Sequence, residues 1–336
     1  MATIQTVTDF LDNLYTTTWQ NRQEGIGDNI FAATPFFFWL KDKGKLKPVR
    51  GGRFIEVNLE YAANPNIAWI GKGGIVSLND YQFLTVAQFQ WRYLTASLVR
   101  FGVDDQQNSG KAQIMSYMNS KMANSEQALV TEMETRLAGG LGTANPGGTT
   151  AFGASIDGLQ ALVNNTPATP GTPVGGIDSG NAGYSWWANQ ATNLTGVSFA
   201  ASGIARMRTL LNNCMNNRKM DRPDIMLSDQ TTFEYYENAN LSFYRITNNK
   251  LADAGFENQT FKGIPMVWSP ALTSILYMLN TNFLEFKYDP AYYFALTEWK
   301  PIPNQVNDRA AQIVLAGQLV TNRRRVQGVL YNINTP

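Results

Sequence analysis

Histidine is absent from this 336-residue chain, and Cys214 is its only cysteine. Without histidine there is no Ser/His/Asp or Cys/His catalytic arrangement and no histidine-ligated metal site. A single cysteine also excludes an internal disulfide bond. Cys214 lies on the apolar face of a helical pattern, so we expect a buried, unreactive thiol. These absences exclude most enzyme chemistry that depends on imidazole or thiolate groups.

Charge is also scarce. Only 16% of the residues are charged, whereas soluble proteins average about 25%. The net charge of +1 gives no global field that would draw the chain onto nucleic acid or an anionic membrane. Polarity comes instead from Asn, Gln, Ser, Thr and Gly. Such a composition favours neutral surfaces that pack against one another.

The sequence predicts neither a targeting segment nor a membrane span. The first twenty residues carry no Lys or Arg and no apolar run of signal-peptide length. The longest apolar runs, Phe36–Leu40 and Ile275–Leu279, fall far short of the roughly 20 residues that a membrane span needs. We therefore expect a soluble protein that has no contact with membrane and is made in a reducing cytoplasm.

Motifs for cofactors and metals are missing as well. Gly71-Lys72 lacks the spacing of a phosphate-binding loop, and no Gly-x-Gly-x-x-Gly follows a strand. Acidic residues form no calcium-loop pattern, so no cofactor or metal is expected. A hydrolase with two carboxylates stays open in principle. Its candidate residues, which nothing else singles out, are Glu234, Glu237, Glu285 and Glu298.

Positive charge is concentrated in one segment, Lys41–Arg53, which holds six basic residues and one acidic residue. A solvated turn explains such a run in the simplest way. The alternative is a surface patch that faces phosphate groups or the carboxylates of a neighbouring molecule.

The clearest β pattern is a long hairpin. From Arg53 to Tyr61 every second residue is apolar, and from Phe83 to Tyr93 one face is again apolar or aromatic. The second run alone would span roughly 40 Å. Glycines in Gly71–Gly74 predict a flexible tip between the two strands. Because a two-stranded ribbon is marginally stable in water, we expect it to lie on another surface, which belongs to another subunit if its own domain does not reach the tip.

Helices are predicted by apolar residues at intervals of three, four and seven. The longest covers residues 109–138, ends at Gly139-Gly140 and would be about 44 Å long. Its methionine-rich stripe is interpreted as core. Shorter amphipathic helices are predicted over Ile4–Leu14 and Ile204–Met215.

The second half of the chain predicts several strands. These are Ile225–Leu227, Phe261–Trp268, Ile275–Leu279, Phe283–Tyr288, Ala310–Val320 and Val326–Ile333. Ile275–Leu279 and Phe283–Tyr288 are expected to form a tight hairpin. Ser228 is expected to cap a helix that continues through Tyr236. Helices and strands are segregated along the chain rather than alternating. The pattern therefore predicts an α+β fold.

The predicted elements follow one another in an uncommon order. An arm is followed by a long hairpin, a long helix, a loop-rich domain and a last group of strands. That order resembles the major capsid proteins of tailed double-stranded DNA bacteriophages, which have the Hong Kong 97-type fold. Short segments similar to phage capsid sequences occur over roughly residues 50–333, and they are Asp157–Val163, Val174–Asp178, Trp186–Asn189, Arg222–Met226, Gly255-Phe256, Phe261–Pro265, Gly317–Val320 and Gln327–Leu330.

The resemblance implies a division of the chain into the parts of that fold. These are an N-terminal arm (1–50), an extended loop (51–100), a peripheral domain (101–149 and 281–321, with a spine helix at 109–138) and an axial domain (150–280 and 322–336). It implies no active site. The implied function is assembly of hexamers and pentamers into an icosahedral virion shell around packaged double-stranded DNA, after synthesis in the host cytoplasm.

Contacts between subunits are expected from the hairpin and from basic residues. The candidates are Lys43, Lys45, Lys47, Trp69, Ile70, Lys72, Arg323, Arg324 and Arg325. Intersubunit ion pairs are the first interpretation of the basic residues, and non-specific contact with DNA phosphate is the second. Expected partners are further copies of the chain, a portal, a separate scaffolding protein and, in some shells, a decoration protein.

One family member links a hairpin-tip Lys covalently to an Asn of a neighbour, with help from a Glu seven residues after the Asn. Lys72 matches the tip, but Val314 stands seven residues after Asn307, and no Glu or Asp lies between Asp308 and Pro336. We therefore expect no isopeptide bond.

Two alternative functions remain at the level of sequence. An encapsulin-type compartment would use the same fold and enclose enzymes instead of DNA. A carboxylate-only hydrolase, from a different class, would be a small oligomer.

Overall fold

The computed structural model describes residues 34–76, 78–102, 115–139, 155–216, 221–239, 259–305 and 307–333. The helix expected over Ile4–Leu14 and the beginning of the helix expected at residue 109 lie outside these ranges. The chain divides into two compact units. The first contains Leu94–Thr131 and Phe294–Val314, and the second contains Ala33–Tyr93, Glu132–Tyr293 and Leu315–Pro336.

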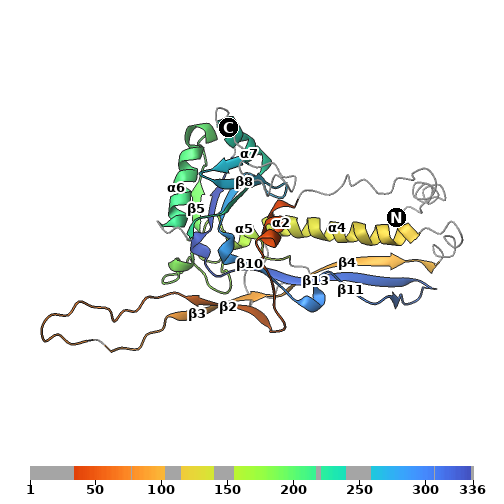
Figure 1. Ribbon diagram of the computed structural model, residues 1–336, viewed down its shortest axis with the longest axis horizontal. Coiled ribbons are helices and arrows are strands. Elements are labelled where there is room, and N and C mark those ends of the chain that lie inside the picture. The colour runs from red at the N-terminus through yellow and green to blue at the C-terminus, as the bar shows by residue number, and fades with distance from the viewer. Residues whose placement is uncertain are drawn as a thin grey trace. The chain divides into compact units, whose positions relative to one another are not determined.

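A six-stranded mixed sheet lies in the second unit (Figure 1). Its strands, in spatial order, are β5 (Gln190–Asn193), β14 (Gly328–Tyr331), β9 (Ile275–Leu279), β6 (Ile225–Ser228), β8 (Ile264–Trp268) and β7 (Gln259–Phe261). Helix α6 (Ile204–Met215) packs on β5 and β14, and α7 (Gln230–Ala239) packs on β8. Their apolar faces enclose a core that includes Met207, Met226 and Met278.

Two details of this region differ from the sequence prediction. The strand predicted over Phe261–Trp268 is two antiparallel strands, because Lys262 and Gly263 form a tight turn with φ of 50° and 79°. Ser228 lies in β6. The cap of α7 is Asp229, whose carboxylate accepts hydrogen bonds from the amide of Thr232 at 3.4 Å and from its hydroxyl.

The tight hairpin predicted around Asn280 is also wrong. β9 pairs with β6 and β14, whereas β10 (Leu284–Tyr288) pairs with β1 and β13 in another sheet. Asn280 turns the chain between the sheets, since its side chain accepts from the amide of Asn282 at 3.1 Å and a short 3₁₀ turn follows. Two apolar strands close in sequence therefore serve two different sheets.

A second sheet in this unit joins the first described residues to the last third of the chain. β1 (Leu46–Pro48) runs parallel to β10, and β10 runs antiparallel to residues 317–321 of β13 (Arg309–Thr321). The buried faces carry Phe286 and Leu319. Helix α2 (Pro35–Asp42) buries Phe36 and Leu40 completely.

The first unit has a small core of its own. Helix α4 (Met115–Gly139) contributes Leu129, β4 (Arg92–Arg100) contributes Leu98, and β13 contributes Ile313. Strands β11 (Ala295–Leu296) and β12 (Lys300–Pro301) pair with β13 in this unit. Met122 packs against this core and Met133 is buried in the second unit, so the interpretation of the methionine stripe as core is confirmed at these positions.

The predicted hairpin is present. β2 (Phe54–Glu60) pairs with β3 (Leu84–Gln90) in antiparallel register, and the inward residues Ile55, Leu59, Ala87 and Phe89 are buried. The second strand ends earlier than its alternation predicts. The Trp91 indole donates to the Gly52 carbonyl at 3.0 Å, and β4 then begins with Arg92 buried and Tyr93 exposed.

Candidate intersubunit surface

The root of the hairpin is held firmly by its own unit. Ala87 and Phe89 lie directly against Gly175, where an added Cβ would come within 2.8 Å of the Ala87 Cβ. The amide of Gln88 donates to the Gly175 carbonyl at 2.9 Å. Beyond β2, the ring of Tyr61 stacks on Trp186 with centroids 5.7 Å apart. The hairpin therefore starts from a fixed position.

Beyond that root, the hairpin exposes an unusual amount of apolar surface. Ten of the sixteen large hydrophobic side chains that are exposed among the described residues lie between Tyr61 and Val86. They are Tyr61, Ile67, Trp69, Ile70, Ile75, Val76, Leu78, Phe83, Leu84 and Val86. We call these ten side chains the hairpin apolar surface. Large apolar side chains exposed together on one segment point to an interaction site rather than to ordinary solvated surface.

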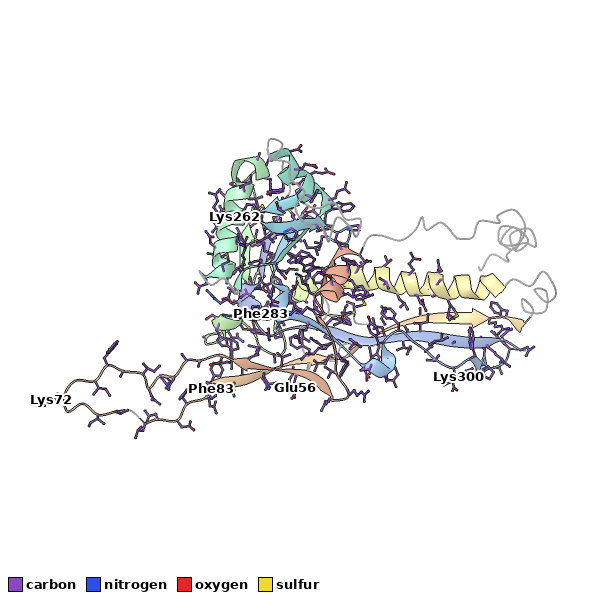
Figure 2. The ribbon with its side chains drawn as sticks, viewed as in Figure 1. Glu56, Lys72, Phe83, Lys262, Phe283 and Lys300 are labelled. Carbon is purple, nitrogen blue, oxygen red and sulfur yellow. The ribbon has the colours of Figure 1, made fainter. Side chains whose placement is uncertain are left out.

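The tip of the hairpin is a short turn with a single charge. The amide of Gly74 donates to the Gly71 carbonyl at 3.0 Å, and the exposed Lys72 lies at the far end (Figure 2). Lys72 is the only charged residue from Tyr61 to Asn79. Trp69 is fully exposed and Ile70 is 48% exposed. These three predicted contact residues thus share one segment.

Sequence reasoning missed three strongly exposed members of the same surface. Ile67, Ile75 and Leu78 are between 81% and 95% exposed. Their only signal in the sequence was the presence of large apolar residues in a segment rich in Gly and Asn. Such residues are usually attributed to a neighbouring strand.

The predicted basic residues after α2 form a separate, polar surface. Lys43 lies at the C-terminal end of α2, where a cation is favoured by the helix dipole, and its Nζ is 4.6 Å from the centroid of the Trp39 ring. Lys45 is half-buried, and Lys47 is exposed on the edge strand β1. In register, Lys47 pairs with Lys287 of β10. The segment thus presents exposed positive charge.

The predicted triplet Arg323–Arg325 does not act as one group. Arg323 is half-buried, pairs with Asp221 at 2.7 Å and stacks over Phe283. Arg324 has no exposed surface, and its guanidinium donates to the carbonyl of Leu162 and to the hydroxyl of Ser179. Its predicted role as an intersubunit contact is therefore wrong.

Arg324 instead ties together segments of its own chain. The donor distances are 2.6 Å to the Leu162 carbonyl and 3.1 Å to Ser179 Oγ. Burial lowers the pKa of its guanidinium to about 10, partly offset by the carboxylate of Asp178. The sequence could not distinguish it from Arg325, because three consecutive arginines look alike until their directions are known. Arg325 is half-buried.

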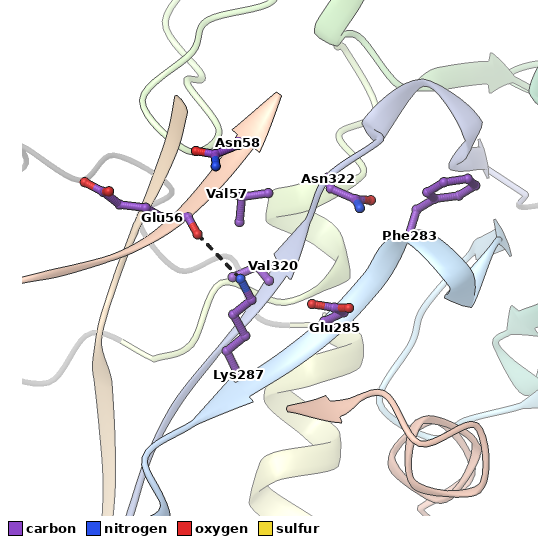
Figure 3. A pocket seen from close by; sticks show the side chains of 8 residues that line it. All are labelled: Glu56, Val57, Asn58, Phe283, Glu285, Lys287, Val320 and Asn322. Carbon is purple, nitrogen blue, oxygen red and sulfur yellow. Dashed lines mark hydrogen bonds between the residues drawn. The ribbon is translucent and has the colours of Figure 1, made fainter. Parts of the chain in front are cut away.

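One groove contains a candidate carboxylate of the hydrolase alternative. Its volume is about 200 Å³, and it is lined by Glu56, Val57, Asn58, Phe283, Glu285, Lys287, Val320 and Asn322 (Figure 3). The Lys287 ammonium donates to the Glu56 carbonyl at 3.5 Å across it. Glu234 and Glu298 are exposed elsewhere, on α7 and near β12. The four nominated carboxylates therefore do not gather in this groove.

Metal ligands and reactive thiols offer no better site. Within the described ranges, no three His, Cys, Asp or Glu side chains are grouped to hold a metal ion. Cys214 is buried on α6, as predicted, and burial raises the pKa of its thiol to about 12. An added Cβ on Gly328 would lie 2.6 Å from its Sγ. This thiol is therefore packed into the core.

None of the helices in the described part of the chain is long and apolar enough to span a bilayer. No protein-family model and no curated protein matches the sequence. Solved structures do match in fold.

Phage capsids are among these solved structures. The capsid of cyanophage A-1(L) matches with a TM-score of 0.65 at 15% identity, covering 99% of both chains. The GTA particle capsid matches with a TM-score of 0.57 at 9% identity, covering 98% of this chain and 99% of the other. The structure of Mycobacterium phage Ogopogo matches with a TM-score of 0.55 at 9% identity, covering 98% of this chain and 99% of the other. The predicted α+β fold of phage capsid proteins is therefore confirmed.

Proposed function

We propose that this chain is a major capsid protein, which assembles as hexamers and pentamers into the icosahedral shell that encloses phage double-stranded DNA. The hairpin apolar surface carries this proposal. It extends from a root fixed to its own unit by Gly175 and Trp186 and stays exposed in the single subunit. A neighbouring copy would cover it.

The energetics favour a covered hairpin. Burial of one large apolar side chain stabilises an interface by about 1.5–3 kcal/mol. Ten such side chains left in water would favour unspecific association of the free subunit. In a shell, the same contact repeats at every subunit, so individually modest contacts sum over the lattice. The low charge of the chain agrees with contacts of this kind, because strongly charged faces would make assembly salt-sensitive.

The parts of the chain would serve the shell as follows. Residues 1–50 form the arm and 51–100 the extended loop; 101–149 and 281–321 form the peripheral domain around the spine helix 109–138; and 150–280 with 322–336 form the axial domain. Support comes from the hairpin β2–β3, which lies wholly within 51–100, and from the mixed sheet, whose strands β5 to β9 and β14 fall within the axial ranges.

Other partners follow from this role. A portal, a separate scaffolding protein and, in some shells, a decoration protein would join the capsid, and packaged DNA would be contacted without sequence specificity. Lys43 and Lys47 are exposed and supply positive charge. Pairing with carboxylates of a neighbouring subunit is the preferred interpretation, and contact with DNA phosphate is the alternative. We propose no catalytic role and no covalent bond at Lys72.

Negative-stain electron microscopy of the purified full-length chain, together with its mass in solution, tests the proposal. We expect capsomers or closed shells of megadalton mass. A stable small oligomer at all concentrations would contradict it and favour the hydrolase. Shells isolated from the native host that contain enzyme cargo and no DNA would favour the encapsulin-type compartment instead.

A further inference from the structure

Helix α2 lacks a cap of its own. The residue before it, Thr34, makes no side-chain hydrogen bond to the helix, and Pro35 occupies the first turn. The first amides of any helix have no partner within the helix, and a buried helix end must find partners elsewhere. Phe36 and Phe37 are both buried, so water does not readily satisfy their amides.

Glu134 of α4 supplies the missing cap from about one hundred residues away. Its Oε1 accepts from the Phe36 amide at 3.1 Å, and its Oε2 accepts from the Phe37 amide at 2.8 Å. The Ser269 hydroxyl donates to Oε1 at 3.4 Å. Only 2% of Glu134 is exposed. One carboxylate thus fixes the beginning of α2.

Among the residues that the structure describes, no cation pairs with this carboxylate. On α2 the charged residues Lys41 and Asp42 lie in the last turn, at the far end of the helix. From the segment after β8 only the hydroxyl of Ser269 reaches Glu134, and on α4 itself the neighbours Glu132 and Arg136 pair with each other in an exposed position. Burial raises the pKa of Glu134 to about 7, and the two amides and the hydroxyl only partly oppose it.

We propose that Glu134 is a proton-linked clamp on α2, so that the attachment of this helix tightens when Glu134 takes up a proton. The buried carboxyl is more easily protonated while α2 covers it. If α2 detaches, water reaches the carboxyl, its pKa returns towards the ordinary value, and the proton is released. By linkage, detachment is favoured as the pH rises from the ordinary pKa of a glutamate to about 7.

The clamp is a property of the single subunit and does not depend on the proposed shell function. Its failure would leave that function untouched, and failure of assembly would leave the clamp testable. The histidine-free sequence makes a carboxyl the available group for a response near neutral pH.

Hydrogen exchange of the unassembled full-length subunit tests the clamp. Amides of Phe36 to Leu40 are compared at pH 5.5 and pH 8.0 after correction for intrinsic exchange rates, with β9 amides as the internal reference. We expect opening of α2 to increase on the order of tenfold at pH 8.0, while β9 does not follow. Equal opening of α2 at the two pH values would overturn the proposal.

Two substitutions assign the effect to Glu134. Glu134→Gln keeps an acceptor for one amide and cannot ionise, so it should abolish the difference between the two pH values. Glu132→Gln, a matched change in the exposed pair with Arg136, should preserve it. If Glu134→Gln does not fold, Ser269→Ala replaces it, since loss of this donor should move the transition to higher pH. A transition unmoved by either variant contradicts the clamp.

Discussion

Gly175 lies against Phe89 so closely that a Cβ at this position would be 3.1 Å from the Cζ of the ring. The φ of Gly175 is 60°, a conformation that glycine adopts at little cost. The contact joins the loop before Trp186 to the inner face of β3. The direction in which the hairpin leaves its unit is therefore set by a glycine far away in sequence.

Replacement of Gly175 should consequently disturb the hairpin and not only the local turn. Gly175→Ala places a methyl group 2.8 Å from Ala87 Cβ, and such overpacking costs about 1–3 kcal/mol. Gly171→Ala is the matched control, because Gly171 also has a positive φ but nothing within 4 Å of the added Cβ. Chemical denaturation and assembly yield measure the effect. Equal losses in both variants would show that backbone conformation alone matters.

The sequence predicted those parts of the fold that depend on local pattern. Alternation in β2 is strict, and Ile55 and Leu59 are buried as expected. The end of β3 could not be predicted, because the switch at Trp91 depends on a hydrogen bond to Gly52 across the hairpin. Likewise, β9 and β10 look like a hairpin in sequence, and only their partners in two different sheets separate them.

The candidate surface was predicted in part for a similar reason. Trp69, Ile70 and Lys72 were found because a glycine-rich tip between two alternating strands is a recognisable local feature. The burial of Arg324 depends on acceptors at Leu162 and Ser179, about 150 residues earlier in the chain, and no local pattern contains that information.

Polar substitution on the hairpin apolar surface should impair assembly and leave the subunit folded. Trp69→Ser removes a side chain that is fully exposed in the single subunit, so its free energy of unfolding should change by less than about 0.5 kcal/mol. Loss of about 1.5–3 kcal/mol per contact should raise the concentration needed for assembly at least tenfold. Static light scattering measures this concentration.

Val197→Thr is the control for that experiment, because Val197 is exposed but lies outside the hairpin. It should assemble at the wild-type concentration. Unchanged assembly of both Trp69→Ser and the corresponding Leu78→Ser variant would refute the role of the surface.

Neutralising the basic segment should show whether its lysines bind carboxylates of a neighbouring subunit or phosphates of DNA. Replacing Lys43, Lys45 and Lys47 together with Gln should lower shell yield if these lysines pair with carboxylates of a neighbour. Shells of normal yield with less packaged DNA would instead show contact with phosphate, and that deficit should depend on salt. Electron microscopy and the ultraviolet absorbance ratio of purified particles measure the two quantities. Lys262→Gln, in the exposed turn between β7 and β8, is the single-charge control.

Arg324 should matter to folding of the free subunit. Arg324→Met leaves the carbonyl of Leu162 and the hydroxyl of Ser179 without this donor in a buried position, and each buried polar group left without a partner costs about 1–3 kcal/mol. Arg325→Met, at a half-buried neighbour, should cost much less. Urea denaturation of unassembled protein compares the two. Similar unfolding midpoints would contradict the structural role assigned to Arg324.

Asp157 should make the stability of the subunit depend on pH. Its carboxylate lies 4.0 Å from the Arg92 guanidinium and accepts a hydrogen bond from Gln318. Burial nevertheless raises the pKa of Asp157 to about 6, with Arg92 and Gln318 opposing the shift. The folded state therefore binds this proton more tightly than the unfolded state, and the free energy of unfolding should fall as the pH rises from about 4 to 6.

Asp157→Asn removes this titration and keeps the size of the side chain. As the pH rises from 4 to 7, the wild type should lose about 1–3 kcal/mol of unfolding free energy relative to the variant. Glu134 is present in both proteins, so its own titration cancels from the difference. Glu132→Gln, in an exposed pair with Arg136, should show no comparable slope. A difference that grows in favour of the wild type with rising pH would mean that attraction to Arg92 outweighs burial.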